Sequence, residues 1–315
     1  MGAERRAAID IGTVTARLLV ADVDGDRVSE VVRRQAITHL GAGWTTTGVL
    51  GEDGMAAVAA AVRGFHDEAR SLGATRIAAV ATSASRDAAN GPAFLDRVER
   101  EAGIRPEIIA GEREAYLTFL GATYGTCADR LLVVDIGGGS TELIVGGACG
   151  EDGRHAVDIE IARSIDVGSR RVTERFLHGD PPATRELAEA SAWVAGELRP
   201  FFAAVRDKPR EIVAVAGTAT SLAAIEMKLD PYDAERVHGF RLSGPSLLDI
   251  LDHLAGLTLE ERRRVVGLEP ERAGVIVGGA IVLQAVLAYA GLSSTLVSEH
   301  DILYGMVLDL DERVG

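Results

Sequence analysis

Positive charge, lysine and cysteine are all scarce in this 315-residue chain. Lys and Arg together number 33 against 47 Asp and Glu, so the formal net charge is −14 at pH 7. Only two of the basic residues, Lys208 and Lys228, are lysines. An overall negative field repels a phosphate backbone, which excludes a general electrostatic nucleic-acid binder. A small, localised phosphate site is compatible with this charge.

The two cysteines, Cys127 and Cys149, lack the CxxC spacing of zinc sites and are too few for a disulfide scaffold. A single disulfide between them is left open. Residues 1–9 are too short and polar to form a signal peptide ahead of the first expected strand. We therefore expect a cytoplasmic protein in a reducing environment.

One apolar segment, residues 273–292, is long enough to be considered as a membrane span. It contains Gln284 and four glycines, however, and it follows the charged stretch 260–264. These features favour a buried interdomain helix, so we expect no membrane association.

The chain repeats one pattern at domain spacing. Residues 7–23 read AAIDIGTVTARLLVADV, and residues 131–147 read LLVVDIGGGSTELIVGG. Each copy is an apolar strand ending in Asp-Ile-Gly, a turn of small residues and a second apolar strand. The two copies, together with a length that suits about two domains, predict α/β domains at 1–125 and 126–315. The last helix is expected to pack back on the first domain.

The turns between these strands have the composition of phosphate sites. Gly12 and Gly137 can adopt positive φ and carry no Cβ, so each turn can direct successive backbone N–H groups at a phosphate. The aspartate at each strand end can hold a cation. A third small-residue turn at Gly217 and Thr218 opens a helix, where an anion is favoured. The sequence contains no GxxxxGK[ST] and no GxGxxG after the first strand, so P-loop and Rossmann folds fit less well.

The chain resembles a known family through several segments spread over almost its whole length. They are Asp10-Ile-Gly-Thr with Arg17, AVATSASRDAAN at 79–90, IIAGEREAYLTFLGAT at 108–123, DIGGGSTE at 135–142, AGTATSLAA at 216–224, His238-Gly239, ERR at 261–263 and ERAGVIVGGAIVL at 271–283. These segments resemble the Ppx/GppA (exopolyphosphatase / guanosine pentaphosphate phosphohydrolase) family, and in particular its short, two-domain, actinobacterial-like members. The resemblance implies two actin-like α/β domains (ribonuclease H-like, ASKHA superfamily) with a central cleft.

The resemblance also implies a role for each matching residue. Glu114 matches the general base that would aim a water at phosphorus; without the resemblance it reads as an acidic residue near a helix N-terminus. Asp135 and Glu142, with Asp10 ranked below them, are the expected ligands of Mg²⁺, and a monovalent cation such as K⁺ is a possible second ion. The expected phosphate-binding residues are Gly12, Thr13, Arg17, Arg86, Gly137, Gly138, Gly139, Ser140 and Thr218. Arg17 could instead pair with an acidic residue in the cleft.

Three departures from the family pattern concern substrate choice more than fold. Val14 and Thr15 stand where the family usually has Asn and Ser, so one side-chain phosphate contact is expected to be absent. His39 replaces a common arginine. The segment SEHDILYGM at 298–306 lacks the arginine that many members have before the glycine.

The function expected from these residues is Mg²⁺-dependent release of terminal phosphate from inorganic polyphosphate, with a preference for shorter chains. The alternative with the same chemistry is hydrolysis of guanosine pentaphosphate. A sugar or acid kinase would need a catalytic aspartate for a hydroxyl acceptor, against which GGGSTE with an upstream GEREA argues. A non-catalytic sensor of phosphate polymers or nucleotides is a third class. A homodimer is expected from the family resemblance alone, and no nucleic-acid partner is expected.

Overall fold

The computed structural model describes residues 2–149 and 156–310, which form two compact units. Unit 1 contains residues 2–125 and returns at the end of the chain with residues 301–310. Unit 2 contains Thr126–Cys149 and Val157–His300.

The two units have the same strand topology in their central sheets. The elements of unit 1 are β1 (Glu4–Ile11), β2 (Thr15–Asp24), β3 (Arg27–Ile37), α1 (Trp44–Thr47), α2 (Glu52–Ser71), β4 (Arg76–Ala81), α3 (Ser83–Asp87), α4 (Gly91–Ala102), β5 (Glu107–Ile108), α5 (Gly111–Ala122) and α13 (Ile302–Asp309). The elements of unit 2 are β6 (Ala128–Ile136), β7 (Thr141–Ala148), β8 (Val157–Ile165), α6 (Ser169–Phe176), α7 (Thr184–Ala204), β9 (Glu211–Val215), α8 (Ala216–Met227), α9 (Ala234–Val237), β10 (Arg241–Ser243), α10 (Gly244–Ala255), α11 (Leu259–Arg262), η2 (Pro270–Arg272), α12 (Ile276–Ala290) and β11 (Ser294–Val297).

The sheet orders are β3-β2-β1-β4-β5 in unit 1 and β10-β11-β9-β6-β7-β8 in unit 2. In each unit three antiparallel strands are followed, after a helical crossover, by a strand that lies parallel to the first. The internal repeat of the sequence is thus a repeat of structure, and both units are actin-like α/β domains.

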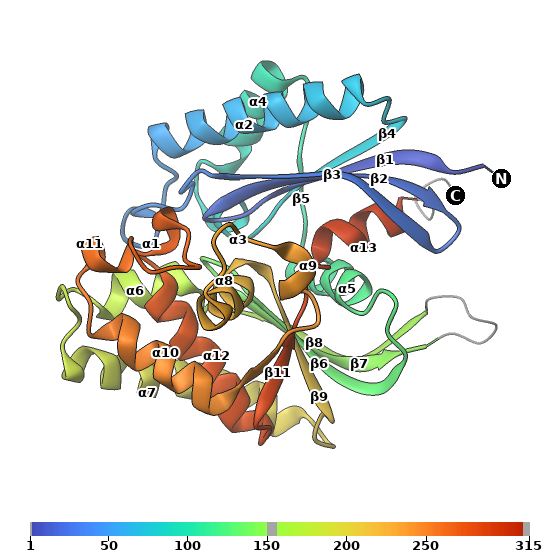
Figure 1. The fold of residues 1–315 in the computed structure, drawn as a ribbon. Coiled ribbons are helices and arrows are strands. Elements are labelled where there is room, and N and C mark those ends of the chain that lie inside the picture. Colours follow the sequence, from blue (N-terminus) through green and yellow to red (C-terminus); the bar gives the residue numbers. More distant parts are fainter. Residues whose placement is uncertain (1, 150–155, 311–315) are drawn as a thin grey trace. The chain divides into compact units, whose positions relative to one another are not determined.

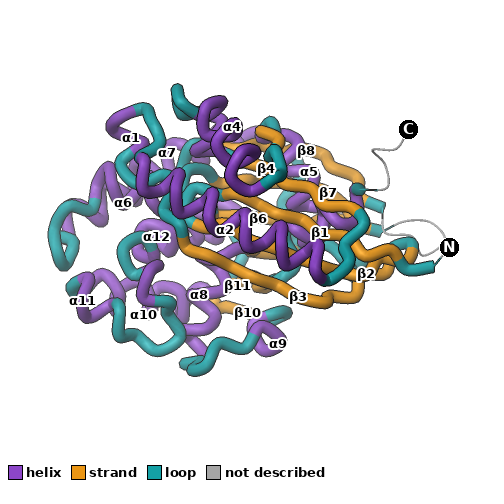
Figure 2. Tube along the Cα trace, turned by 90° about the horizontal axis from the view of Figure 1, so that it is seen from above, coloured by secondary structure: helices purple, strands orange, loops and turns teal. Residues whose placement is uncertain are grey.

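Strands β1 and β2 of unit 1 are buried on both faces because helices cover both (Figure 1). Alternate residues of β1 point in opposite directions, so Ala7, Ile9 and Ile11 pack under α2 and α4 while Ala8 faces α5 and α13. Seen from above, α2 lies over the strands of this sheet, and α4 lies beside α2 (Figure 2). This double burial explains why β1 and β2 read as near-continuous apolar runs.

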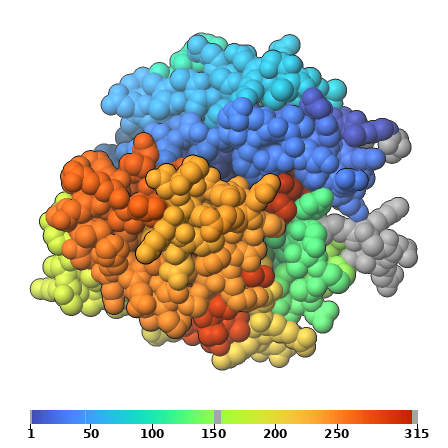
Figure 3. All heavy atoms as spheres, viewed as in Figure 1, coloured from blue at the N-terminus to red at the C-terminus, as the bar shows by residue number. Residues whose placement is uncertain are grey.

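The last helix, α13, packs against α5 at a contact that only glycine permits. A Cβ on Gly121 of α5 would lie 1.8 Å from the carbonyl oxygen of Asp301, and a Cβ on Gly305 of α13 would lie 1.8 Å from that of Leu117. The α13 residues 302–307 are buried, so little of this segment shows on the face drawn in Figure 3. The C-terminal helix is therefore part of the core of unit 1.

The apolar segment that could have been a membrane span is a buried helix in the core of unit 2. Its helix is shorter than the apolar segment: the 3₁₀ helix η2 comes first, and the 15-residue α12 follows after a break. The break places Arg272 against Gly217, where a Cβ would lie 1.8 Å from its Nη1 atom. Helix α12 packs with α6, α7, α8 and α10, so its apolar residues are buried within unit 2. Within the described part of the chain, no helix has both the length and the apolarity to cross a membrane.

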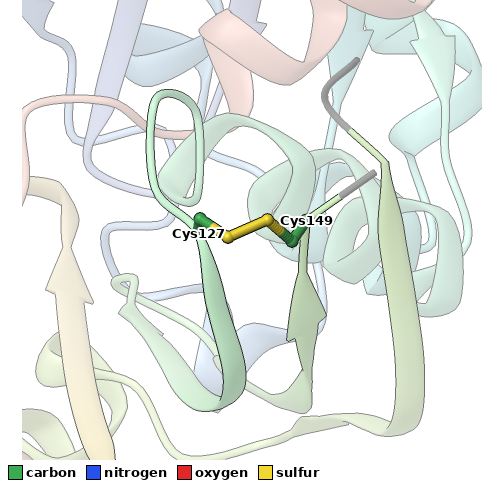
Figure 4. Close-up of a disulfide and its surroundings, with 2 residues drawn as sticks. All are labelled: Cys127 and Cys149. Carbon is green, nitrogen blue, oxygen red and sulfur yellow. A yellow bond between two sulfur atoms is a disulfide. The ribbon is translucent and has the colours of Figure 1, made fainter. Parts of the chain in front are cut away.

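A disulfide joins Cys127, just before β6, to Cys149, just after β7 (Figure 4). The two residues are exposed and lie at the ends of adjacent antiparallel strands. The bond that the sequence left open is therefore formed, and it closes the hairpin at the end away from its turn.

Replacement of Gly121 by alanine is expected to lower the free energy of unfolding by roughly 1–3 kcal/mol or more, because its Cβ would overlap the backbone of the α13 N-terminus. Urea denaturation monitored by circular dichroism measures this change. The matched control is Gly64→Ala, at an exposed position of α2 with nothing within 4 Å of the new Cβ. That control should stabilise by about 0.5–1 kcal/mol, since glycine weakens a helix interior. Equal stability of the two variants would contradict the proposed close contact.

Candidate functional site

In the turn between β1 and β2, the carbonyl groups accept hydrogen bonds from the segment 38–41, and the amide groups point away from that segment. Gly12 N donates to Thr15 O at 2.9 Å and closes the turn. The carbonyl of Thr13 accepts from Gly41 N, and the carbonyl of Val14 accepts from the N–H groups of residues 38 and 39, each at 2.9 Å. Because N–H and C=O point in opposite directions across a planar trans peptide, the amides of residues 14 and 15 face away from this supporting segment.

The turn between β6 and β7 is built in the same way, with helix α6 as the support. Gly137 N donates to Ser140 O at 3.0 Å, which repeats the closure of the first turn. The carbonyl of Gly137 accepts from Ser169 N at 2.8 Å. The carbonyl of Gly138 accepts from the backbone N–H groups of Arg170 and Arg171, at 3.0 and 3.1 Å. The first turn of α6 thus satisfies its own N–H groups with the loop's carbonyls.

The amides of Gly138, Gly139 and Ser140 consequently point away from α6. These three residues are buried, and within the described residues their N–H groups reach no protein acceptor. Buried amides almost always find a partner, and consecutive amides without one form a nest for an anion. The turn is therefore suited to hold phosphate oxygens.

Glycine is needed in these turns for space rather than for a left-handed backbone. Neither Gly12 nor Gly137 has a positive φ, although the sequence indicated this conformation as one reason for glycine at both positions. A Cβ would lie 3.2 Å from Thr15 O in the first turn and 3.3 Å from Ser140 O in the second. The support in unit 2 is tighter, since a Cβ on Gly168 would lie 2.4 Å from the carbonyl of Gly138.

The same register position carries opposite chemistry in the two hairpins. Asp10 of β1 is directly opposite Arg17 of β2, and Asp135 of β6 is directly opposite Glu142 of β7. Arg17 donates to Asp10 Oδ2 from Nη2 at 2.5 Å and from Nε at 3.1 Å, so the first pair is a salt bridge. Burial raises the pKa of Asp10, and the charge of Arg17 opposes this rise. The alternative in which Arg17 pairs with an acidic residue is thus observed.

The second pair brings two carboxylates together beside the glycine turn. Residues directly opposite each other in an antiparallel pair project to the same face, with Cβ atoms about 5 Å apart. Asp135 and Glu142 are both buried, and Ser164 Oγ donates to Glu142 Oε1 at 2.7 Å. Two like charges at this spacing repel each other, and a cation would offset that repulsion. One or two carboxylates with phosphate oxygens and waters is the usual ligand set of Mg²⁺, so these residues fit such an ion. Within the described residues, no cluster of three or more metal-ligating side chains is present.

Glu114 and Arg86 are paired in unit 1. Glu114, in the first turn of α5, is buried, and its Oε2 accepts from Arg86 Nη1 at 3.1 Å. Arg86 also donates to the carbonyl of Ile109 at 3.2 Å. It lies on the short helix α3. The guanidinium fixes the carboxylate on one side, which orients the remaining oxygen of Glu114.

Thr218 lies in the first turn of α8, where its hydroxyl donates to the carbonyl of Ile136 at 3.1 Å. This bond ties the start of α8 to the last residue of β6, next to the glycine turn. Ala216, at the head of the helix, has a left-handed φ of 61°. The side chain of Thr218 therefore supports the turn 137–140 just before its first residue, through the carbonyl of Ile136.

Comparison with known proteins identifies the family of this chain. Residues 19–310 match the model of the Ppx/GppA phosphatase family. This chain belongs to the Ppx/GppA phosphatase family. As a member of that family it is a phosphoanhydride hydrolase, which confirms the enzyme class expected from its motifs.

Individual relatives cover nearly all of this Ppx/GppA chain. Exopolyphosphatase 2 of Mycobacterium tuberculosis is 36% identical over 329 aligned positions, covering 98% of this chain and 99% of that protein. The crystal structure of an exopolyphosphatase-like protein superposes with a TM-score of 0.92 at 37% identity, covering 100% of this chain and 99% of the other. The Aquifex aeolicus PPX-GPPA enzyme gives a TM-score of 0.80 at 31% identity, with coverages of 98% and 99%.

Several residues that build the site were not identified from the sequence. Ser164 and the carbonyl-binding segment 38–41 are recognisable only once the strands are paired. Asp301, which is buried and ion-paired with Arg17, was passed over although it lies in the quoted segment SEHDILYGM. An aspartate just before an apolar helical run is a typical N-cap signal, and that signal could have singled it out.

Replacement of Gly168 by alanine in this Ppx/GppA protein is expected to lower turnover by about 10²- to 10³-fold. Its Cβ would push α6 away from the Gly138 carbonyl and disorder the amides of the phosphate turn, and loss of one preorganised donor has an effect of this size. Steady-state phosphate release measures it. The control is Gly196→Ala, an exposed position of α7 with nothing within 4 Å of the new Cβ. Unchanged turnover in Gly168→Ala would show that the α6 support is dispensable.

Proposed function

We propose that this Ppx/GppA protein is a Mg²⁺-dependent exopolyphosphatase that releases orthophosphate from the end of inorganic polyphosphate. The observation that carries the proposal is the turn 137–140, where three buried amides turned away from α6 adjoin two facing carboxylates. A nest of amides suits phosphate oxygens, and paired carboxylates suit a divalent cation. Similarity to exopolyphosphatases along the whole chain supports the same substrate class.

In this proposal unit 1 supplies the general base. Hydrolysis of a phosphoanhydride needs a water aimed in line at phosphorus, with the charge on the equatorial oxygens stabilised. Glu114 would orient and deprotonate that water. Arg86, which holds one Glu114 oxygen, keeps the carboxylate in place. The turn 12–15 offers further amides to phosphate.

Asp135 and Glu142 would hold Mg²⁺, and Asp10 is the weaker candidate because Arg17 already neutralises it. When bound, the ion supplies charge neutralisation for the phosphate oxygens. The amides of Gly138, Gly139 and Ser140 orient the phosphate and stabilise its developing charge.

A preference for shorter chains follows from the charge of the protein. With a net charge of −14, the surface does not hold a polyanion by its length, so affinity comes from a few local contacts. Extra phosphates beyond those contacts would add repulsion rather than binding energy. A homodimer, a K⁺ site and a cytoplasmic location stay predictions.

Guanosine pentaphosphate is the second candidate substrate, because the attacked bond is of the same type and a PPX-GPPA enzyme is similar along the full length. Val14 stands where the family usually has Asn, but this difference does not favour a non-catalytic sensor. The backbone amide of residue 14 is still present, and it can bind phosphate whatever the side chain is. Phosphate binding at this turn therefore depends on the main chain.

The experiment that tests the proposed function compares phosphate release from short polyphosphate, long polyphosphate, guanosine pentaphosphate and ATP, each with Mg²⁺ and after chelation with EDTA. We expect fast release from short polyphosphate and near-complete loss of activity after chelation. Faster release from guanosine pentaphosphate would favour the second candidate. Undiminished activity after thorough chelation would refute the dependence on Mg²⁺, and a strong preference for long chains would refute the local-contact argument.

Glu114→Gln is expected to lower kcat by about 10²- to 10⁴-fold, the range for removal of a general base, while the variant folds normally. The amide keeps the size of the side chain and can still meet Arg86, so only basicity is lost. The matched control is Glu112→Gln, an acidic residue of the same helical turn. Steady-state kinetics and a thermal melt of both variants separate catalysis from folding, and near-wild-type kcat in Glu114→Gln would remove it from the base role.

A further inference from the structure

Arg17 is held by two carboxylates from opposite ends of the chain. Its Nη2 and Nε donate to Asp10, and its Nη1 donates to Oδ2 of Asp301. The side chains of Asp10 and Asp301 are 5% and 4% exposed, and that of Arg17 is 15% exposed. The contact lies entirely within unit 1, because Asp301 is the residue at which the chain returns to that unit.

Asp301 uses both carboxylate oxygens, each for a different partner. Oδ1 accepts from Leu303 N at 3.0 Å, which makes Asp301 the N-cap of α13. Oδ2 accepts from Arg17. One side chain therefore begins the last helix and anchors the arginine that meets the aspartate of the first phosphate turn.

The same residue reaches the helix that carries Glu114. The carbonyl of Asp301 lies against Gly121 of α5, at the glycine contact between α5 and α13. An unbroken series of contacts thus runs from Asp10 through Arg17 and Asp301 to α5. A shift of Asp301 would be felt at the phosphate turn and at the helix of the proposed base.

We propose that Asp301 is a positioning residue for phosphate binding, which acts by holding Arg17 in the orientation that it has beside Asp10 and the turn 12–15. The proposal rests on the proposed function insofar as the bound phosphate is that of a phosphoanhydride substrate. Without the Asp301 carboxylate, Arg17 is held only by Asp10, and its side chain gains rotational freedom. The loss should fall on substrate affinity, because Arg17 adjoins the phosphate turn and is not the proposed base.

Asp301→Asn separates the two roles of the side chain, because asparagine is a good N-cap but carries no charge. Asp301→Ala removes both the cap and the charge. The matched control is Asp309→Asn, since Asp309 lies on the same helix, has a side chain that is also 4% exposed and is ion-paired with Arg113 of α5. This control removes an equally buried carboxylate from an arginine away from the phosphate turn.

The measurements are kcat and KM for tripolyphosphate with Mg²⁺, its Kd by calorimetry, and a thermal melt of each variant. We expect Asp301→Asn to raise KM and Kd at least fivefold with kcat changed less than threefold and with a melting temperature close to that of Asp309→Asn. Asp301→Ala should show the same rise in KM with a lower melting temperature. Asp309→Asn should leave KM and Kd within twofold of wild type.

A double-mutant cycle shows whether Asp301 acts through Arg17. In an Arg17→Met background, Asp301→Asn should raise Kd no further, because the group that it positions is gone. Kd and KM within twofold of wild type in Asp301→Asn would overturn the proposal, as would an equal rise in Asp309→Asn. If wild type binds tripolyphosphate without hydrolysing it, the proposed function fails while the comparison of Kd values still decides the role of Asp301. Absence of binding by wild type would overturn both.

Discussion

The demand that buried peptide groups be hydrogen-bonded shapes both hairpin turns, 12–15 and 137–140, which are proposed to bind phosphate. In each turn, neighbouring structure takes up the carbonyl oxygens: the segment 38–41 in unit 1 and the N-terminus of α6 in unit 2. The amides then face the other way because the peptide is planar. A helix N-terminus would ordinarily bind the anion itself. In unit 2 it binds the loop instead, and the loop presents the amides. This indirect arrangement explains why Gly168 and the glycines of the turn lie in such close contact.

One substitution within the duplicated hairpin distinguishes the chemistry of the two units. The backbone of the repeat places a side chain opposite the strand-end aspartate in both copies. In unit 1 that side chain is Arg17, and the aspartate is neutralised internally. In unit 2 it is Glu142, so two carboxylates face each other at the end of the hairpin. The repeated hairpin thus carries different charges in the two units: an ion pair in unit 1 and two facing carboxylates in unit 2.

The sequence predicted the two repeated hairpins, β1–β2 and β6–β7, because their strands are long apolar runs. It did not predict α9 or the three-residue β10, which are too short to show a period and are set by tertiary contacts. It also missed the break before α12, since the glycine-rich segment continues the apolar pattern while Arg272 needs the space over Gly217. At the site, the motifs identified the turns and the pairing of Asp135 with Glu142. The partner of Arg17 could not be identified from its spacing, because Asp301 is 284 residues away and is brought close only by the packing of α13 on α5.

The disulfide between Cys127 and Cys149 makes the β6–β7 hairpin a covalent ring. The ring contains the glycine turn and both carboxylates proposed to hold the cation. Closing a loop of this length removes roughly 3 kcal/mol of conformational freedom from the unfolded chain. A single cut in the peptide backbone between the two cysteines would also leave the chain in one piece. The two strands of the β6–β7 hairpin are therefore linked both by their backbone hydrogen bonds and by the disulfide.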